Sequence, residues 1–257
     1  MRSHPPTLLT LARRVIEDEK LFEKTDRVLV AVSGGPDSMA LLHALAILKK
    51  KMGFDLVAHG VDHGLRKTAA QELDLAEAFA ARLDVPFART NLKVASGGNL
   101  QARARDARHE ALEKARVNGK AAVIATAHHA DDRAETMLIR ILRGTGVRGL
   151  AVLPPRAEGA PLVRPFIFAR RDDIDRHNER HAVPFSVDPS NHDPRFLRTR
   201  VRAELIPLLS ELNPGAVSHL CKLAQELSDA RPDSAPSVRN DERDDGEERD
   251  QSLFEET

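Results

Sequence analysis

The sequence has one cysteine, Cys221, among 257 residues. A single thiol excludes an internal disulfide framework, a four-cysteine zinc site and an iron–sulfur cluster held by the protein's own thiolates. We therefore expect Cys221 to act as a small buried hydrophobic residue. Tryptophan and tyrosine are absent, so only phenylalanine and histidine are available for stacking on nucleobases.

Long hydrophobic runs are also missing. The first twenty residues, MRSHPPTLLTLARRVIEDEK, contain a short apolar run that is soon followed by Arg13 and Arg14. This pattern resembles neither a secretory signal nor a membrane span. We expect a cytoplasmic protein with no membrane association, and the length is sufficient for an ample hydrophobic core.

Charge is balanced over the whole chain but unevenly distributed along it. Residues 231–257 hold four basic and ten acidic residues, a net charge of −6, whereas residues 1–230 hold 35 basic and 29 acidic residues, a net charge of +6. The basic body permits a polyanionic partner. The acidic tail has few large apolar residues, and this composition predicts disorder.

Short apolar β-rich runs alternate with longer segments whose apolar residues recur at three- and four-residue steps. The predicted strands are residues 27–32, 54–62, 86–92 and 121–127. The alternation predicts an α/β fold with a doubly wound, mostly parallel sheet and a small helical C-terminal extension. We expect ligands at the carboxyl ends of the strands.

The rest of the chain is less regular. A leading helix is predicted at about 7–22, a Pro-rich connection with one short strand follows Gly149, and two helical segments are predicted at about 196–209 and 214–228. We expect four regions: an N-terminal helix (1–24), a nucleotide-binding domain (25–155), a connection with a helical extension (156–230) and the acidic tail (231–257).

The hexapeptide SGGPDS, Ser33 to Ser38, separates the first predicted strand from a helix. Such a turn points backbone N–H groups and the positive end of the helix dipole at one place, which makes an anion site. The lysine of a Walker A loop is missing. Asp37 would repel a phosphate directly, so we expect it either to cap the helix or to hold Mg²⁺ that bridges phosphate oxygens. The expected phosphate-binding residues are Ser33, Gly34, Gly35, Pro36 and Ser38.

Polar residues also follow two other predicted strands. Asp62 and His63 end the second strand, and the segment after the fourth strand carries His128, His129, Asp131, Asp132 and Glu135. Zinc is disfavoured because no third nitrogen or sulfur ligand lies nearby in the sequence. An oxygen-rich magnesium site that uses Asp37 and Asp132 is favoured, while Asp131 is equally well explained as a helix N-cap.

Two segments are rich in arginine. Arg105 and Arg108 share a helix face, and a solvated basic face and a phosphate or RNA contact explain them equally well. Arg198 and Arg202 are four residues apart and would repel each other unless an anion lies between them or water solvates them. The second segment therefore favours an anion. It also contains Arg195 and Arg200.

The hexapeptide after a buried strand resembles the PP-loop of the N-type ATP pyrophosphatases, which cleave ATP between its α- and β-phosphates to adenylate a substrate. Between Val28 and about Leu209 the chain as a whole resembles the tRNA(Ile)-lysidine synthetase family. The further matching segments are HGVDHGLR, NLQARARDAR, ATAHHADDRAETMLIRILRGTGVRGL, LVRPF with RRDDI, and DPSNHDPRFLRTRVRAELIPLL.

This resemblance implies ATP-dependent ligation of free L-lysine to C2 of the wobble cytidine, position 34, of tRNA(Ile) with a CAU anticodon, which yields lysidine, AMP and diphosphate. It implies that Asp37 and Asp132 hold Mg²⁺ and that Arg198 or Arg200 stabilises charge on the α-phosphate. ATP would contact the loop together with Asp62, His63 and His128. Glu135 or Asp131 would hold the lysine ammonium, and tRNA would contact Arg105, Arg108, Arg195 and Arg202.

The chain departs from the family pattern in two places. His109 stands where the family often has tyrosine, and we expect the chain to resemble the short form, which lacks the C-terminal domains of longer members. We expect tRNA discrimination to rest on the body and its last helices, with a homodimer as one arrangement.

Three other functions fit the sequence less well. A tRNA thiolase of the same superfamily generally needs several cysteines, and the single cysteine argues against it. An amidating enzyme such as a GMP or NAD synthetase is disfavoured by the arginine-rich last helices. A catalytically silent RNA-binding protein is disfavoured by the intact Asp37 and Asp132.

Overall fold

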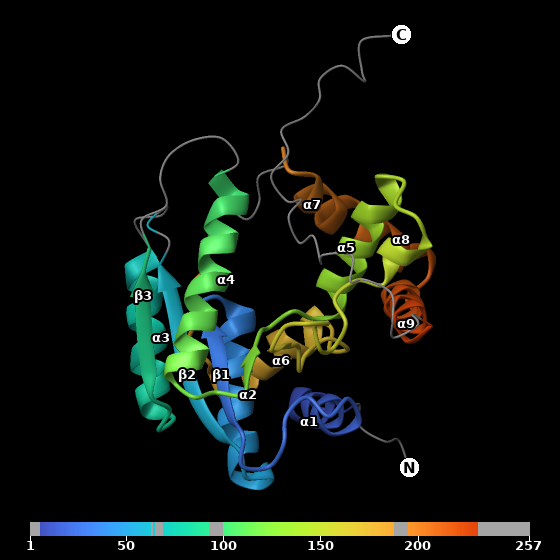
Figure 1. The fold of residues 1–257 in the computed structure, drawn as a ribbon. Helices are drawn as coiled ribbons and strands as arrows, with labels where there is room; N and C mark the ends of the chain where they lie inside the picture. The colour runs from blue at the N-terminus through green and yellow to red at the C-terminus, as the bar shows by residue number, and fades with distance from the viewer. Residues whose placement is uncertain (1–5, 63, 65–68, 93–99, 188–194, 231–257) are drawn as a thin grey trace.

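The computed structural model describes residues 6–62, 64, 69–92, 100–187 and 195–230. Within these residues five parallel strands form one sheet in the order β3-β2-β1-β4-β5 (Figure 1). Their bounds are Arg27–Val32 (β1), Asp55–Asp62 (β2), Phe87–Asn91 (β3), Val123–Ala125 (β4) and Leu162–Val163 (β5). The chain order reverses between β1 and β4, so the switch point of the sheet lies between their carboxyl ends.

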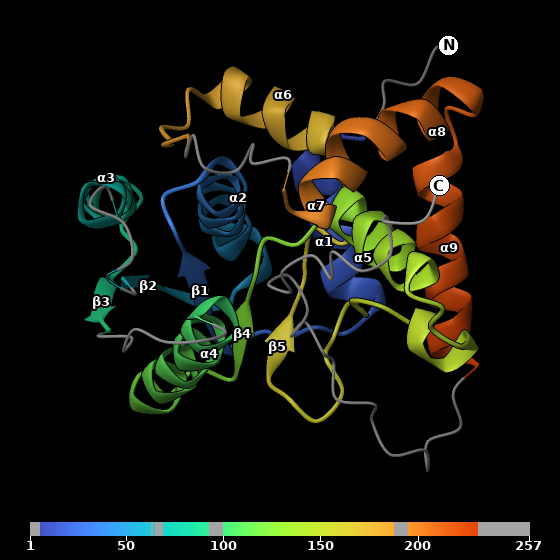
Figure 2. The same ribbon diagram turned by 90° about the horizontal axis from the view of Figure 1, so that it is seen from above.

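Helices cover both faces of the sheet. The helices of the body are α1 (Leu8–Asp18), α2 (Pro36–Met52), α3 (Ala69–Arg82), α4 (Leu100–Asn118), α5 (Ala130–Leu142), the 3-10 helix η1 (Val147–Leu150) and α6 (Arg171–His181). The C-terminal helices are α7 (Leu197–Arg200), the π-helical turn η3 (Val201–Leu205), α8 (Ile206–Leu212) and α9 (Ala216–Asp229). Viewed from above, α2 and α3 lie on one face and α4 on the other (Figure 2).

The alternation of side chains along β1 explains how both faces are filled. Val28, Val30 and Val32 pack into the large core with α1 and α2. Leu29 and Ala31 point to the opposite face, where they pack in a cluster with Leu112 of α4, among others. Because both faces of β1 are buried, the strand is a continuous apolar run, as expected for a central parallel strand.

The C-terminal helices pack on α5, which begins at the end of β4 (Figure 1). Ala134 and Leu138 of α5 form an apolar cluster with Val201, Ile206, Val217 and Cys221. Arg133 of α5 is fully buried, donates to the carbonyl of Val152 at 3.0 Å, and donates to Gln225 of α9 at 3.0 Å. This packing places α7 and η3 beside the first turns of α5.

The fold class predicted from the sequence is confirmed, with three local differences. The leading helix ends at Asp18 instead of Phe22, because the chain turns at Lys20 with a φ of 47° and buries Leu21 and Phe22 in the core. The fourth strand is shorter than predicted, and the segment 196–209 is divided by a π-helical turn. The region boundaries 1–24, 25–155 and 156–230 stay predictions, and the tail 231–257 lies outside the described residues. None of the described helices combines the length and apolar character needed to span a bilayer.

Candidate active site

The hexapeptide forms the turn between β1 and α2. Gly35 is the N-cap of α2 and Pro36 opens the helix. Gly34 has a φ of 82°, and a Cβ there would lie 2.6 Å from the backbone oxygen of Glu72, so only glycine fits. The Ser38 hydroxyl accepts from the Ser33 N–H at 3.2 Å and donates to the Gly35 carbonyl at 3.0 Å. Ser38 therefore holds the turn closed at the start of a seventeen-residue helix.

Two cavities adjoin this turn, and four residues line both of them: Ser33, Gly35, Asp37 and Arg108. The larger cavity, about 720 Å³, extends towards α3, α6 and η3 and is also lined by Val61, Glu72, Arg171, Phe185 and Arg202. The smaller cavity, about 440 Å³, extends towards α4 and β4 and is also lined by Arg105, His109, Thr126, His128 and Asp132. The turn thus separates two spaces and is accessible from each.

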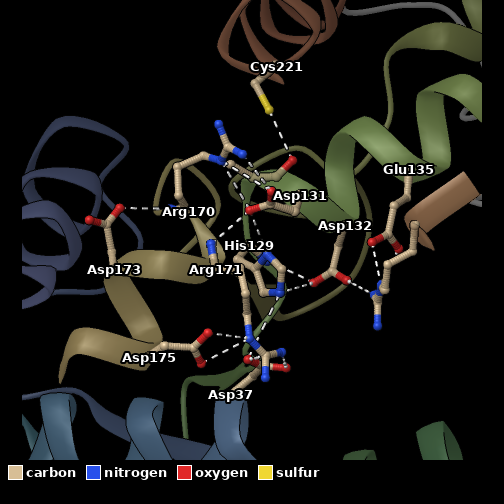
Figure 3. Close-up of polar contacts among 12 residues, drawn as sticks. Asp37, His129, Asp131, Asp132, Glu135, Arg170, Arg171, Asp173, Asp175 and Cys221 are labelled. Carbon is tan, nitrogen blue, oxygen red and sulfur yellow. Dashed lines mark hydrogen bonds and ion pairs between the residues drawn. The ribbon is translucent and has the colours of Figure 1, made fainter. Parts of the chain in front are cut away.

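His129 lies at the centre of the acidic residues (Figure 3). It is the N-cap of α5 and only 3 % exposed. Its Nε2 is 3.4 Å from Asp132 Oδ2 and 4.0 Å from Asp37 Oδ1, and its Nδ1 is 3.5 Å from Asp131 Oδ2. Burial lowers the pKa of His129, but these three carboxylates together raise it to about 9. The ring is therefore an imidazolium at neutral pH.

Asp37 is held from the opposite side by Arg171. The guanidinium Nη1 is 3.0 Å from Asp37 Oδ1 and donates to Oδ2 at 3.2 Å. Burial raises the pKa of Asp37 above its usual value. The nearby His129 and Arg171 offset this rise only in part. Asp37 Oδ1 is buried and accepts no hydrogen bond from the described residues. A buried carboxylate oxygen without a donor is a suitable ligand for a cation.

Asp131 is bound by the N-terminus of α6. Arg170 Nη2 is 2.9 Å from Asp131 Oδ1, and the backbone N–H of Arg171 donates to Asp131 Oδ2 at 2.8 Å. Although burial raises the pKa of Asp131, the His129 imidazolium and the Arg170 guanidinium beside it lower it to about 2. The N-cap explanation for Asp131 is wrong, because His129 caps α5 and Asp132 accepts the His129 N–H at 3.1 Å.

Glu135 is the anion that lies between Arg198 and Arg202. It is 1 % exposed, accepts from Arg198 Nε at 3.1 Å, and accepts from Arg202 Nε and Nη2 at 2.6 Å and 2.8 Å. Arg202 also donates to Asp132 Oδ1 at 3.2 Å. Burial raises the pKa of Asp132, but His129, Arg198 and other nearby cations bring it well below its usual range. The anion expected from the arginine spacing is thus, in this structure, the protein's own carboxylate.

The remaining predicted residues lie in several places. Arg105, Arg108 and His128 line the smaller cavity, and His128 Nδ1 is 3.0 Å from the Thr126 hydroxyl. Asp62 ends β2, where its Oδ1 accepts from the Gly64 N–H at 2.8 Å. His63 lies outside the described residues.

Arg200 and Arg195 are not brought to the cavities. Arg200 is exposed and forms a two-bond ion pair with Glu204, at 3.1 Å for each bond. Arg195 is exposed just before α7. Neither residue is among those that line the two spaces beside the turn.

Sequence reasoning missed Arg170 and Arg171. These arginines bind acids that precede them by about 40 and 134 residues. One local signal was present: two cations stand at the N-cap and first position of α6, where the helix dipole disfavours positive charge. Such a placement calls for anionic partners, which Asp37 and Asp131 supply.

The acids fit a cation only in part. Asp37 and Asp132 both approach Nε2 of His129, and Asp37 Oδ1 lacks a hydrogen bond. No group of three or more potential ligands in a metal-binding arrangement occurs among the residues described. A cation at Asp37 would therefore need further ligands, such as phosphate oxygens and water.

Comparisons with a family model and with curated proteins point to the same family. The model of a PP-loop domain family matches residues 8–209. The tRNA(Ile)-lysidine synthase of Thermobifida fusca is 38 % identical over 88 % of this chain and 69 % of the relative. That of Geobacter sulfurreducens is 37 % identical over 86 % of this chain, but the match spans about half, 48 %, of its length.

Among solved structures, the U34-tRNA thiolase NcsA from Methanococcus maripaludis, with its [4Fe-4S] cluster, superposes with a TM-score of 0.73. The alignment covers 86 % of this chain and 78 % of the thiolase at 16 % identity, so it supports the fold alone. The PP-loop domain implies ATP binding. The sequence matches and the fold together establish that the chain belongs to the PP-loop superfamily and, within it, to the tRNA(Ile)-lysidine synthase family.

Proposed function

We propose that the protein joins L-lysine to C2 of cytidine 34 in tRNA(Ile) with a CAU anticodon, consuming ATP and forming lysidine, AMP and diphosphate. The observation that carries this proposal is that Ser33, Gly35 and Asp37 line both cavities. A phosphate at the N-terminus of α2 is then accessible from two sides, as transfer of AMP to a second substrate requires. The names of the relatives supply the identity of that substrate.

The chemistry explains why ATP is needed. The C2 oxygen of cytosine is a poor leaving group, so an amine cannot displace it directly. Transfer of AMP to this oxygen breaks the bond between the α- and β-phosphates and converts the oxygen into part of a good leaving group. The lysine amine then attacks C2, and AMP departs with the oxygen.

The chain's own groups would perform two tasks in this reaction. The N–H groups at the start of α2 would bind the departing diphosphate through the helix dipole. Arg198 or Arg200 would stabilise charge on the α-phosphate. Arg200 can take this role only if it leaves Glu204.

The proposed reaction also uses Mg²⁺, which carboxylate side chains would bind. Asp37 and Asp132 are the residues that would hold it, and Asp37 Oδ1 is buried and accepts no hydrogen bond, although it is ion-paired with Arg171. When bound, Mg²⁺ supplies neutralisation of phosphate charge.

We propose that Arg105, Arg108, Arg195 and Arg202 contact the tRNA, and that Glu135 or Asp131 holds the lysine ammonium. Because guanidinium groups occupy both acids in this structure, lysine binding would require one arginine to move. A tRNA substrate implies a cytoplasmic enzyme, and the homodimer stays a prediction.

The rival thiolase chemistry is disfavoured by Cys221. The thiol is 4 % exposed, donates to the carbonyl of Ala130 at 3.2 Å, and lines neither cavity. Burial raises its pKa to about 11, so the nucleophilic thiolate is scarce at neutral pH.

The test is incorporation of labelled lysine into an unmodified tRNA(Ile) transcript with a CAU anticodon, given ATP and Mg²⁺. A transcript with uridine at position 34 is the control. We expect label in the first transcript alone, with AMP released in step. AMP release that depends on tRNA without lysine incorporation would contradict lysine as the nucleophile, and the absence of both signals would favour a silent RNA-binding protein.

A further inference from the structure

Arg171 bridges two carboxylates at the edge of the larger cavity (Figure 3). Its Nη1 is 3.0 Å from Asp37 Oδ1, and its Nε is 3.1 Å and 3.3 Å from the two oxygens of Asp175. Asp175 lies four residues later on α6. The guanidinium therefore has an anchor on its own helix that does not depend on Asp37.

The position of this guanidinium conflicts with a second cation at Asp37. Magnesium bonds to carboxylate oxygens at about 2.0–2.1 Å. Arg171 Nη1 lies beside the Asp37 oxygen that lacks a hydrogen bond. A metal ion on that oxygen and the guanidinium in its present place would be two positive charges only a few ångströms apart, which repel strongly in a partly buried site.

We propose that Arg171 is a placeholder cation, which neutralises Asp37 in the nucleotide-free protein and gives way when Mg²⁺ arrives with ATP. The guanidinium then stays anchored on Asp175 and turns to the polyphosphate that enters the larger cavity. A planar guanidinium can form two hydrogen bonds with a phosphate, so the displaced group gains a new anion. This inference rests on the Mg²⁺ and ATP part of the proposed function and is independent of lysine and tRNA.

The proposal predicts opposite changes in two affinities when Arg171 loses its charge. Mn²⁺ binding to the nucleotide-free protein, followed by electron paramagnetic resonance, should become about tenfold tighter in Arg171→Gln, because one of the two cations beside Asp37, Arg171 and His129, is gone. ATP binding at saturating Mg²⁺ should become about tenfold weaker, because one phosphate ligand is lost. A merely structural role for Arg171 would weaken both.

Three further variants make the test specific. Arg171→Lys keeps the positive charge and should leave Mn²⁺ affinity close to that of the unchanged protein. Asp37→Asn combined with Arg171→Gln should abolish the gain in Mn²⁺ affinity, which places the ion at Asp37. Arg176→Gln removes another arginine of α6, one that pairs with Asp173, and should change neither affinity.

Unchanged or weaker Mn²⁺ binding in Arg171→Gln would overturn the proposal, as would a gain that persists without Asp37. Failure of the proposed function would give a different set of results. If lysine is not incorporated but the two affinities move in opposite directions, the placeholder role of Arg171 stands and the ligase reaction falls.

Discussion

His43 and His177 share a hydrogen bond of 2.9 Å between Nδ1 of the first ring and Nε2 of the second. This bond joins α2, which begins at the phosphate-binding turn, to α6, whose first residues bind Asp37 and Asp131. Burial, with a further contribution from His181, lowers the pKa of His43 to about 4. Burial also lowers the pKa of His177 to about 3, and His43 and His181 add to the effect.

Because the pKa values of His43 and His177 are lowered, we expect the folded protein to lose stability in acid. Both rings are neutral in the folded protein at pH 7, and the unfolded chain binds protons more readily below pH 6.5, so stability is full above 6.5 and falls as the pH drops towards 4 and 3. We expect the free energy of unfolding to decrease by about 2–4 kcal/mol between pH 7 and 4.5. Urea unfolding at several pH values measures this decrease.

His177→Phe should flatten this dependence, because one of the two titrating rings is removed. His219→Gln is the matched control, since His219 is exposed on α9. An equally steep loss of stability in His177→Phe would show that other groups cause it.

Asp37→Ala is expected to abolish adenylation without preventing tRNA binding. The rate of AMP formation should fall by about 100-fold or more, since a group that organises phosphate charge is lost. The tRNA dissociation constant should stay within about threefold, because basic residues make the phosphate contacts. Labelled ATP and filter binding give the two values. Asp172→Ala, at an exposed position on α6, is the control, and loss of tRNA binding in Asp37→Ala would mean that this acid has a different role.

Glu135→Gln should loosen the attachment of η3 to α5. The buried carboxylate accepts from both Arg198 and Arg202, so its neutralisation should lower the free energy of unfolding by about 2 kcal/mol. Glu204→Gln breaks the exposed pair with Arg200 and should leave stability unchanged. Urea unfolding of the two variants decides, and equal effects would contradict the importance of burial.

Cys221→Ala should retain AMP formation and lysine incorporation. In the unchanged protein the thiol should react with a maleimide at least about 100-fold more slowly in buffer than in urea, because it is buried and protonated. Thiol labelling followed by mass spectrometry measures the ratio. Loss of AMP formation in the alanine variant would return a thiol to the mechanism.

Much of the fold was predictable because the apolar pattern is local. The strand predicted at 27–32 has the bounds of β1, the one predicted at 54–62 begins one residue before β2, and the one predicted at 86–92 is one residue longer than β3 at each end. A short strand was expected in the connection after Gly149, and β5 lies there, but its two residues carry no periodic signal, so its exact position follows from the pairing of Leu162 with Ile124. The π-helical turn η3 was also hidden, although Pro207 beyond it lacks the N–H that an unbroken helix needs.

The candidate site was predictable to the extent that sheet topology determines it. Asp37 and Asp132 follow β1 and β4, which are neighbours, and both acids lie around His129. The pairing of Arg171 with Asp37 depends on how α6 packs against α2, which no local pattern specifies. The burial of Glu135 likewise depends on where η3 meets α5.

The turn after β1 also receives a hydrogen bond from outside the sheet. The backbone N–H of Ser186 donates to the Gly34 carbonyl at 2.9 Å, although the two residues are 152 positions apart. Ser186 lines the same cavity as Asp37. Its amide is therefore a built-in reporter of the turn: hydrogen exchange at this one position would register nucleotide entry in solution, with no label on either substrate.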